Sequence, residues 1–422
     1  MVIENNKQYS TLIDLIRGKD VAIVVIRDDY RIHPRKSKAI VASLCCGSEK
    51  YDIIFSHSES TSNLHPANIQ ELNVAKRFWV DDAKQFYHLT GFKNIYDVKI
   101  MNWANDKEYP DLPIPGVFDF VYNRAKKDGN KIVPLMKVLE YSRDRLLNLG
   151  KMSDELSITR SALKYNRSSI YLANIESVGM KTIDDYWYSN YNMYTSTGRP
   201  SNTFGGINFA ALPKEDGTRK QIISRHESGM LIEFDYDAYH LRLLGNVLDY
   251  KFQFDKSLHQ YFADEVYHCT YEEAKTKSFQ ILYGNLPIDE KRNPFFYGVD
   301  RLAHAIQDEF SKYKCFKSHI YKKPFGMESV IDVNKNKLLN YYTQSYETER
   351  NMEVIGKIQY YLREKKTKMI LYTYDSFLFD FDIKEGLDII KELKKISEID
   401  SFPVRVKAGS DYDSLKDITA RL

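Results

Sequence analysis

Two aspartates far apart in the sequence stand where apolar runs end, and together they could perform phosphoryl transfer. Asp235 closes the run MLIEFD, and Asp375 lies between two β-type runs in MILYTYDSFLFDF, as at the tip of a hairpin. If the two strands are neighbours, the carboxylates meet at one edge of a sheet. Such hard oxygen ligands suit two Mg²⁺ ions that bridge the phosphates of a nucleotide. Taken alone, each Asp is more often a turn or cap residue.

A segment between the two aspartates, YEEAKTKSFQILYG (271–284), carries a lysine and two rings on one helix face. Lys275, Phe279 and Tyr283 are spaced at i, i+4, so an ammonium group stands at one end and two aromatic rings follow it. Such a face could hold a triphosphate by its charge and a base or sugar by stacking. The alternative is a helix that buries both rings and leaves Lys275 at the rim.

The elements that must position these residues follow from the hydrophobic pattern. The predicted order is a helix at 11–18, β-runs at 21–27, 39–46 and 51–57, a helix-like stretch at 78–89, a βα alternation through 95–104, a break at 109–116, and a mainly helical region at 134–192 with a turn and helix cap at 150–155. A polar, glycine-rich stretch then precedes the strand of Asp235, further helices, the strand pair around Asp375 and a closing βαβ-like tail. This order predicts an α/β domain followed by a second, larger unit.

Composition places the chain among globular proteins without naming its function. The 422 residues are 43% hydrophobic, 28% charged and 14% aromatic, which excludes a disordered or collagen-like chain. The longest apolar runs are too short to span a bilayer and the first residues lack a signal-peptide block, so we expect a soluble, cytoplasmic protein without a membrane partner. Four cysteines without CxxC spacing favour a reducing compartment. A net charge of +3 is too mild to indicate a nucleic-acid binder by itself.

Seven segments within residues 195–416 resemble, in the same order, the motifs of the family A DNA polymerases, typified by bacterial DNA polymerase I and its phage relatives. They are TSTGRPS (195–201), FDYDAYHLR (234–242), DKSLHQYFADEVY (255–267), KTKSFQILYG (275–284), KLLNYYTQSYETE (337–349), YTYDSFLFDF (372–381) and FPVRVKAGSDYDSLK (402–416). These segments are similar to the T-x-TGR-x-S element, the first palm motif, the D-x-H-x3-A-x3-(F/Y) segment, the fingers helix K-x3-F-x3-YG, the N-x3-Q helix, the second palm motif and the terminal motif. Each match is weak alone, and the ordered set is specific.

The resemblance implies an α/β and α+β multidomain protein. Its parts would be an RNase H-like 3′–5′ exonuclease-type domain at 1–133, a reduced helical thumb at 134–192, and a right-hand palm and fingers at 193–422, with the fingers near 255–325. The implied activity is template-directed addition of deoxynucleotides to a primer 3′ end, with two Mg²⁺ ions as cofactors. Primer–template DNA and dNTPs would be the partners, and the short thumb leaves room for a processivity or replisome partner. The compact form favours a phage, plasmid or other mobile replicon.

The resemblance also implies roles for single residues. Asp235 and Asp375 would be the catalytic metal ligands. Lys275 and His259 would neutralise the incoming triphosphate, Phe279 would pack on its sugar and base, and Tyr283 would stack at the templating position.

A second group, Arg199, Asn340 and Gln344, would face the minor groove of the primer–template, where every base pair offers acceptors. For Asn340 and Gln344 the alternative is an amide pair that bridges its own helix.

Several positions depart from the family pattern. Tyr271 stands where the fingers helix usually has an arginine, and Lys277 or Lys220 are candidates to restore that charge. Ala238 and His240 replace the glutamine and glutamate of the first palm motif, and Ser376 replaces the glutamate of the second. Because that first glutamate excludes the ribose 2′-hydroxyl, His240 leaves relaxed sugar choice open.

These losses favour an alternative function, a catalytically weak or silent scaffold that binds primer–template DNA. Retention of both aspartates and of Lys275 and Phe279 opposes it, since a pure binder needs no paired metal carboxylates.

The amino-terminal part resembles the proofreading domain more weakly and lacks its metal ligands. Val25 and Arg27 stand in place of D-x-E, Phe86 replaces a later aspartate, and the last motif survives only as Tyr141 and Asp144, one residue short. Without converging carboxylates two metals cannot be held, so we expect an inert scaffold. The alternative is an unrelated α/β domain.

Overall fold

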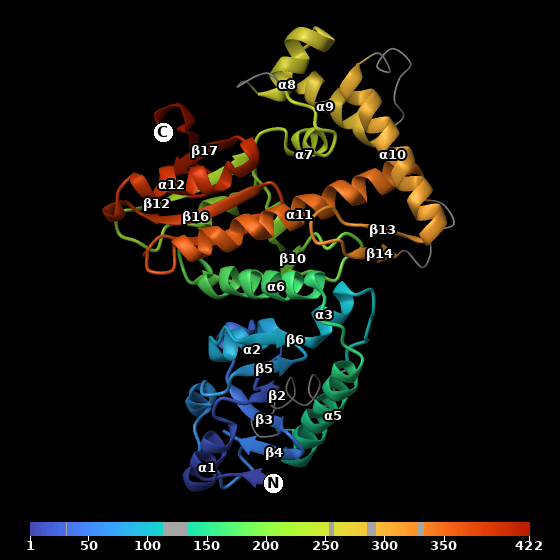
Figure 1. Cartoon of the computed structure of the whole chain (residues 1–422). Coiled ribbons are helices and arrows are strands. Elements are labelled where there is room, and N and C mark those ends of the chain that lie inside the picture. Colours follow the sequence, from blue (N-terminus) through green and yellow to red (C-terminus); the bar gives the residue numbers. More distant parts are fainter. Residues whose placement is uncertain (31, 113–132, 253–256, 285–292, 327–332) are drawn as a thin grey trace. The chain divides into compact units, whose positions relative to one another are not determined.

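The computed structural model describes residues 1–30, 32–112, 133–252, 257–284, 293–326 and 333–422 (Figure 1). The chain divides into two compact units, Met1–Ser177 and Val178–Leu422. Across the described ranges, no helix combines the length and the apolar character needed to cross a bilayer. The second half of the expected break at 109–116 lies outside the described residues.

The first unit contains a six-stranded sheet in the order β1-β4-β3-β2-β5-β6. β3 runs antiparallel to both β2 and β4, whereas β5 and β6 continue the sheet parallel to β2. The apolar runs predicted at 21–27 and 39–46 form the central strands, as their β-branched residues favour. The strands are β1 (Val2–Ile3), β2 (Asp20–Arg27), β3 (Ala39–Cys46), β4 (Glu49–Ile54), β5 (Arg77–Val80) and β6 (Ile95–Asp97).

Capping side chains set where the first three helices of this unit begin. The stretch 78–89, expected to be helical, starts as β5 and becomes helix only after Asp82, whose carboxylate accepts a hydrogen bond from Gln85 N at 2.9 Å. Asp97 closes β6 and caps the next helix in the same way, accepting from Ile100 N at 2.9 Å. The helices are α1 (Asn6–Ile16), α2 (Ala83–Thr90), α3 (Val98–Ala104), α5 (Leu135–Asp154) and α6 (Arg160–Val178).

The expected domain boundary at residue 133 does not coincide with the division of the chain. α5 packs on β2 and β3, and its Leu139 and Leu149 share a buried core with Val24 and Val41. Residues 134–177, expected to belong to a separate thumb, therefore lie within the first unit. The expected turn at 150–155 is also wrong, because α5 continues through Gly150 to Asp154. The apolar face of α5 outweighs the low helix propensity of that glycine.

The second unit is built on a five-stranded sheet in the order β15-β16-β12-β17-β18. β16 and β17 each pair antiparallel with β12, so they are parallel to each other, and the chain passes from one to the other through α12. The predicted βαβ-like tail is thus confirmed. The elements are β12 (Gly229–Tyr236), β15 (Lys368–Thr373), β16 (Ser376–Asp382), α12 (Asp388–Ser397), β17 (Val404–Gly409) and β18 (Lys416–Asp417).

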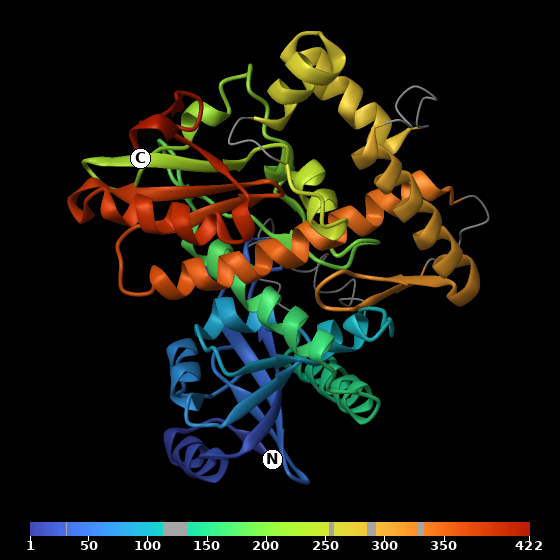
Figure 2. The same cartoon turned by 45° about the horizontal axis from the view of Figure 1, so that its top comes forward.

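Helices cover one face of this sheet. α12 packs on β17 and on the long helix α11 (Lys335–Tyr361), and Figure 2 shows the two helices side by side. Tyr236 of β12 points to this face, where its hydroxyl donates to Ser397 O at 2.8 Å. Because side chains alternate along a strand, Glu233 and Asp235 point to the opposite face.

A helical arm follows β12. It comprises α7 (Tyr239–Val247), α8 (Leu258–Tyr261), a π-helical turn (Phe262–Tyr267), α9 (Tyr271–Tyr283) and α10 (Pro294–Tyr313). Thr270 and Glu273 form a capping box that fixes the start of α9. The remaining strands are short: β7 (Met180–Lys181), β8 (Tyr186–Trp187), β9 (Tyr191–Asn192), β10 (Ser201–Phe204), β11 (Ile207–Asn208), β13 (Cys315–Lys317) and β14 (Pro324–Gly326).

Candidate nucleotide and metal site

The two aspartates expected to meet lie at the same edge of the sheet, Asp235 on a strand and Asp375 in the turn next to it. Asp235, near the end of β12, is directly opposite Ser376, the first residue of β16. Asp375 occupies the turn between β15 and β16, and its carbonyl accepts a hydrogen bond from Tyr236 N at 3.0 Å. The predicted hairpin tip and the predicted strand pairing are both confirmed.

The surroundings of Asp375 are unusually unfavourable for a carboxylate. Asp375 is exposed at the surface, although many protein atoms surround its carboxyl group and reduce its solvation. This desolvation, together with the negative charges of Glu347 and Asp235, raises the pKa of Asp375 to about 6. A cation placed beside it would relieve both effects.

A lysine from the next strand already lies beside Asp235. Lys407 Nζ is 2.9 Å from Asp235 Oδ2 and 2.9 Å from Glu233 Oε2, so one ammonium group bridges two carboxylates on the same face of β12. Tyr412 also donates to Glu233, at 3.2 Å. The ammonium group shows that this place attracts positive charge. Sequence reasoning missed both Glu233 and Lys407, and the i, i+2 spacing of Glu233 and Asp235 was the available signal.

Glu347 is a further carboxylate that the sequence reasoning missed. It is 1% exposed on α11, where it pairs with Arg199 (Nε to Oε2, 3.0 Å) and faces His240 (Nε2 to Oε1, 3.5 Å). It lies seven positions after Asn340 and three after Gln344, so all three share one helix face. That periodicity could have identified it.

The residues expected to face DNA are brought together around α11. Gln344 Nε2 donates to Asn340 Oδ1 at 3.0 Å, and Thr197 donates to Gln344 Oε1 at 3.3 Å. The alternative interpretation, an amide pair bridging its own helix, is therefore what this structure contains. Arg199 lies with its guanidinium carbon 3.6 Å from the centre of the Tyr374 ring, next to Asp375 in the chain.

The face of α9 carries its lysine and rings as the spacing predicted. Lys275 is exposed, Phe279 is 39% exposed, and Phe279 and Tyr283 stack with ring centres 6.2 Å apart. The hydroxyl of Tyr283 forms a short hydrogen bond with His240 Nδ1. This bond ties the end of α9 to the segment that follows Asp235.

His259 does not carry the positive charge expected of it. The side chain is 4% exposed, with its ring beside those of Tyr271 and Phe279, and Nδ1 finds no hydrogen-bond partner among the described residues. Burial, helped by the nearby charges of Lys275 and Arg405, lowers the pKa of His259 to about 4. The imidazole is therefore neutral at pH 7 in this structure.

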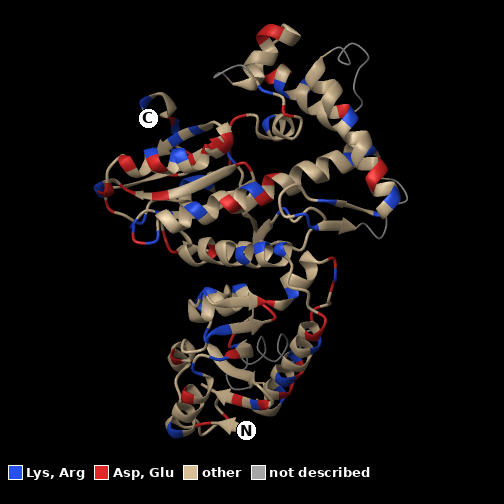
Figure 3. Ribbon diagram, in the orientation of Figure 1, with Lys and Arg blue, Asp and Glu red and all other residues tan. Residues whose placement is uncertain are grey.

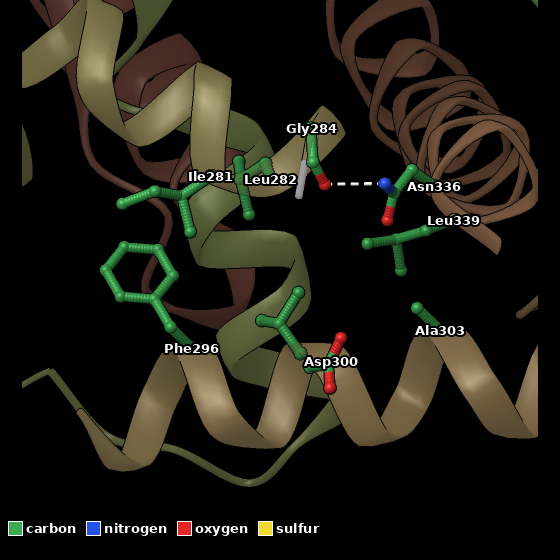
Figure 4. A pocket seen from close by; sticks show the side chains of 9 residues that line it. Ile281, Leu282, Gly284, Phe296, Asp300, Ala303, Asn336 and Leu339 are labelled. Atoms are coloured by element: carbon green, nitrogen blue, oxygen red, sulfur yellow. Dashed lines mark hydrogen bonds between the residues drawn. The ribbon is translucent and has the colours of Figure 1, made fainter. Parts of the chain in front are cut away.

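A small pocket lies beyond the end of α9 (Figure 4). It is bounded by α9, α10 and α11, and Asn336 Nδ2 closes one side by donating to Gly284 O at 2.5 Å. None of the residues predicted to bind nucleotide or metal lines it. The lining residues are Ile281, Leu282, Gly284, Phe296, Val299, Asp300, Ala303, Asn336 and Leu339.

The first unit has an arginine at one of the positions where the sequence resemblance expects a metal-binding carboxylate. Arg27, at the end of β2, is buried and donates to Asp29 O at 2.8 Å, Ile32 O at 2.7 Å and Gln85 Oε1 at 3.1 Å. Val25 and Phe86 are buried in the apolar core, as their side chains require. A guanidinium with this many partners leaves no place for a cation.

One buried cluster in the first unit has the composition of a metal site. Ligand atoms of His33, His88 and Glu176 lie within 4.8 Å of one another. Glu176 is already paired with Lys84 Nζ at 2.6 Å and His88 Nε2 at 2.7 Å. Burial opposes its charge, but Lys84 and His88 lower the pKa of Glu176 to about 2. The cluster acts as a buried ion pair that ties α2 to α6.

Charge in the second unit is organised locally. Figure 3 shows acidic and basic residues interspersed over both units, consistent with a net charge of +3.

Asp235, Asp375 and Glu347 are not among the groups of described residues whose ligand atoms all lie within 4.8 Å of one another, as a metal site made by the protein alone would need. Mg²⁺ commonly takes only one or two protein carboxylates and completes its shell with water and substrate phosphates. The arrangement therefore suits an ion brought together with a phosphate ligand.

Comparison with known proteins identifies the fold. The chain is similar to a solved structure described as the POL domain of Pol1 from M. smegmatis in complex with DNA primer-template and dNTP, with a TM-score of 0.73 and 11% sequence identity over 98% of this chain and 99% of that chain. No protein-family model and no curated protein sequence matches it. The chain thus has the fold of a DNA polymerase domain.

Proposed function

We propose that this protein is a template-directed DNA polymerase of the family A type, which adds deoxynucleotides to a primer 3′ end. The observation that carries the proposal is that Asp235 on β12 lies beside the turn that carries Asp375, within a fold similar to a polymerase domain. α9 adds support, because its lysine and exposed phenylalanine offer contacts for a nucleotide.

Asp235 and Asp375 would hold the metal ions. They supply hard oxygen ligands, desolvation and like charge raise the pKa of Asp375, and the ammonium group of Lys407 beside Asp235 supports a preference for positive charge at this place. When bound, Mg²⁺ supplies positive charge to the primer hydroxyl and to the pyrophosphate leaving group. The chain's own task is to keep the two carboxylates at one edge of the sheet, and the β12–β16 pairing would hold Asp235 beside the turn that carries Asp375.

The incoming nucleotide would lie between these carboxylates and α9. Lys275 has no ion pair among the described residues, so its charge is available to a triphosphate. Phe279 would pack on the sugar and base, and Tyr283 would stay hydrogen-bonded to His240 beside them. Arg199, Asn340 and Gln344 would follow the minor groove, with the Gln344–Asn340 hydrogen bond opening to give its donors to the bases.

The proposed enzyme would lack proofreading. Arg27 and Phe86 occupy two of the positions where the resemblance to the proofreading domain expects metal-binding carboxylates. That unit would serve as a scaffold.

A primer-extension assay with a labelled primer tests the proposal. We expect wild-type protein with Mg²⁺ to extend a matched primer and to leave a mismatched 3′ end unshortened. Asp375→Asn should lower the extension rate by about a hundredfold or more, because the lost interaction is worth several kcal/mol in the transition state. Asp413→Asn, an exposed aspartate on the same unit, serves as the matched control and should keep full activity.

Extension that survives Asp375→Asn would refute the site. Tight binding of primer–template by wild-type protein without any extension would favour the scaffold function instead.

A further inference from the structure

The start of α9 lacks the positive charge that a triphosphate site needs at this point. Tyr271 is the first residue of the helix, one turn before Lys275. His259, which packs against Tyr271, is neutral. Lys275 alone would then face a group that carries several negative charges.

A guanidinium from another part of the chain lies at that place. Arg405 of β17 is the residue directly opposite Asp235 of β12, and cross-strand partners in an antiparallel pair project from the same face of the sheet. The side chain reaches from the metal-site aspartate toward α9. There, Arg405 Nη2 donates to Tyr271 Oη at 3.2 Å and to Ser257 Oγ at 3.1 Å.

Part of this guanidinium remains available. Nη2 also bonds to Asp237 Oδ1 at 2.6 Å, but within the described residues Nη1 and Nε make no hydrogen bond. The side chain is 37% exposed. Asp237 pairs with Arg242 as well, at 3.0 Å, so Arg405 shares this carboxylate with a second guanidinium group.

We propose that Arg405 is a triphosphate-binding residue that replaces, from strand β17, the cation missing at the first turn of α9. Together with Lys275 it flanks the space between Asp235 and the helix, and the free edge of the guanidinium binds phosphate oxygens of the incoming nucleotide. This inference rests on the proposed function. It identifies the cationic group that would bind the triphosphate although α9 begins with Tyr271 and not with an arginine. Lys277 lies over the Tyr267 ring at 4.2 Å, so we do not assign to it the replacement of this cation.

A purely structural role is the rival explanation, because Arg405 also links β17 to α8 and α9 through Asp237, Ser257 and Tyr271. We call this structural link the latch. Its loss would lower stability and weaken DNA binding as much as nucleotide binding. A phosphate ligand would affect nucleotide binding selectively, and its charge could be supplied from another position. Tyr271 contacts Arg405 directly, so an arginine at position 271 can deliver that charge.

The experiment compares wild type, Arg405→Gln, the double variant Arg405→Gln/Tyr271→Arg, and Arg363→Gln as an exposed control. The Kd of a complementary dNTP is measured on complexes with a dideoxy-terminated primer–template and Ca²⁺, so that no chemistry occurs. The Kd of primer–template, the Tm, and thermal protection by inorganic tripolyphosphate are measured on the same proteins. Tripolyphosphate needs neither template nor catalysis, so this arm tests Arg405 even in an inactive protein.

We expect Arg405→Gln to raise the dNTP Kd by roughly tenfold to a hundredfold, as for a lost charge-assisted hydrogen bond, and to abolish protection by tripolyphosphate. The double variant should recover most of the loss, and the Kd for primer–template should change less than about twofold. Wild-type dNTP affinity or unchanged tripolyphosphate protection in Arg405→Gln overturns the inference while leaving the proposed function intact. A parallel loss of Tm and DNA binding without recovery in the double variant overturns it in favour of the latch. Failure of the wild-type protein to bind dNTP instead counts against the proposed function.

Discussion

Charged side chains lie at the ends of the sheet strands in both units, but their neighbours differ between the two units. In the first unit, Arg27 at the end of β2 is surrounded by carbonyl oxygens and an amide, and Arg145 is paired through two nitrogens with Asp81 at 2.8 Å. In the second unit, Asp375 lies within reach of two other negative charges. A network in which every charged group has partners stabilises a fold. Like charges close to Asp375 oppose its ionisation, so a bound cation would stabilise the ionised carboxylate. Only the second arrangement is suited to chemistry.

Two carboxyl groups with a raised pKa, Asp97 and Asp375, sharpen the contrast. The pKa of Asp97 is raised to about 7 mainly by burial, and that carboxyl accepts hydrogen bonds from Ala83 N and Ile100 N as a helix cap. The pKa of Asp375 is raised to about 6 by desolvation and by Glu347 and Asp235. A raised pKa therefore marks structure in one place and a candidate site in the other, and the identity of the neighbours distinguishes the two.

The largest change in stability is expected when the hydrogen-bond network of Arg27 is removed. Arg27→Ala should lower the free energy of unfolding by about 3 kcal/mol, because Asp29 O and Ile32 O lose a buried charged donor. Urea unfolding measures the change, and Arg17→Ala, an exposed pair with Asp14, should stay within about 0.5 kcal/mol of wild type. Equal effects of the two substitutions would show that the Arg27 network is not a stabilising element.

An intermediate effect is expected where the second sheet holds its lysine. Lys407→Met leaves Glu233 and Asp235 without a counter-charge, so the variant should lose about 1–2 kcal/mol in EDTA. Mg²⁺ should restore that loss and give a larger rise in Tm than in wild type, since a ligand bound only to the folded state stabilises it. Lys416→Met on β18 is the control. An Mg²⁺ response no larger than that of wild type would contradict a cation site at Asp235.

The smallest effect tests the pH dependence of the first unit. Because the folded pKa of Asp97 is raised to about 7, the stability from this carboxyl is fully present below its unfolded pKa of about 4 and is lost as the pH rises through 7. Asp97→Asn cannot titrate, so its Tm should fall less than that of wild type between pH 5 and pH 8, by a few degrees. Asp14→Asn should follow wild type. Parallel curves for all three proteins would place the pKa of Asp97 near its ordinary value.

The sequence predicted most of the framework of the site for local reasons. The apolar runs ending at Asp235 and Asp375 define two strands, and the i, i+4 spacing from Lys275 to Tyr283 defines a helix face. Errors arose where tertiary packing overrode a local signal. Gly150 reads as a turn but lies inside α5, and residues 134–177 read as a separate helical domain although α5 completes the core of the first unit.

The residues that adjust the chemistry were not visible in the sequence. Lys407 meets Asp235 across 172 positions, and Arg405 meets Tyr271 across 134. Strand register brings such pairs together, and register depends on the whole sheet. Glu347 had a periodic signal on its helix, but only the packing of α11 brings it near Asp375.

By itself, the amino-acid sequence determined the order of the elements, the two aspartates and the face of α9, because hydrophobic period and residue type act over a few positions. The tertiary structure alone decided which charges surround them. The Coulomb energy of a site depends on distances between groups that only folding brings together. The three-dimensional structure was therefore needed to find the pairing of Lys407 with Asp235, the burial that keeps His259 neutral and the contact of Arg405 with α9.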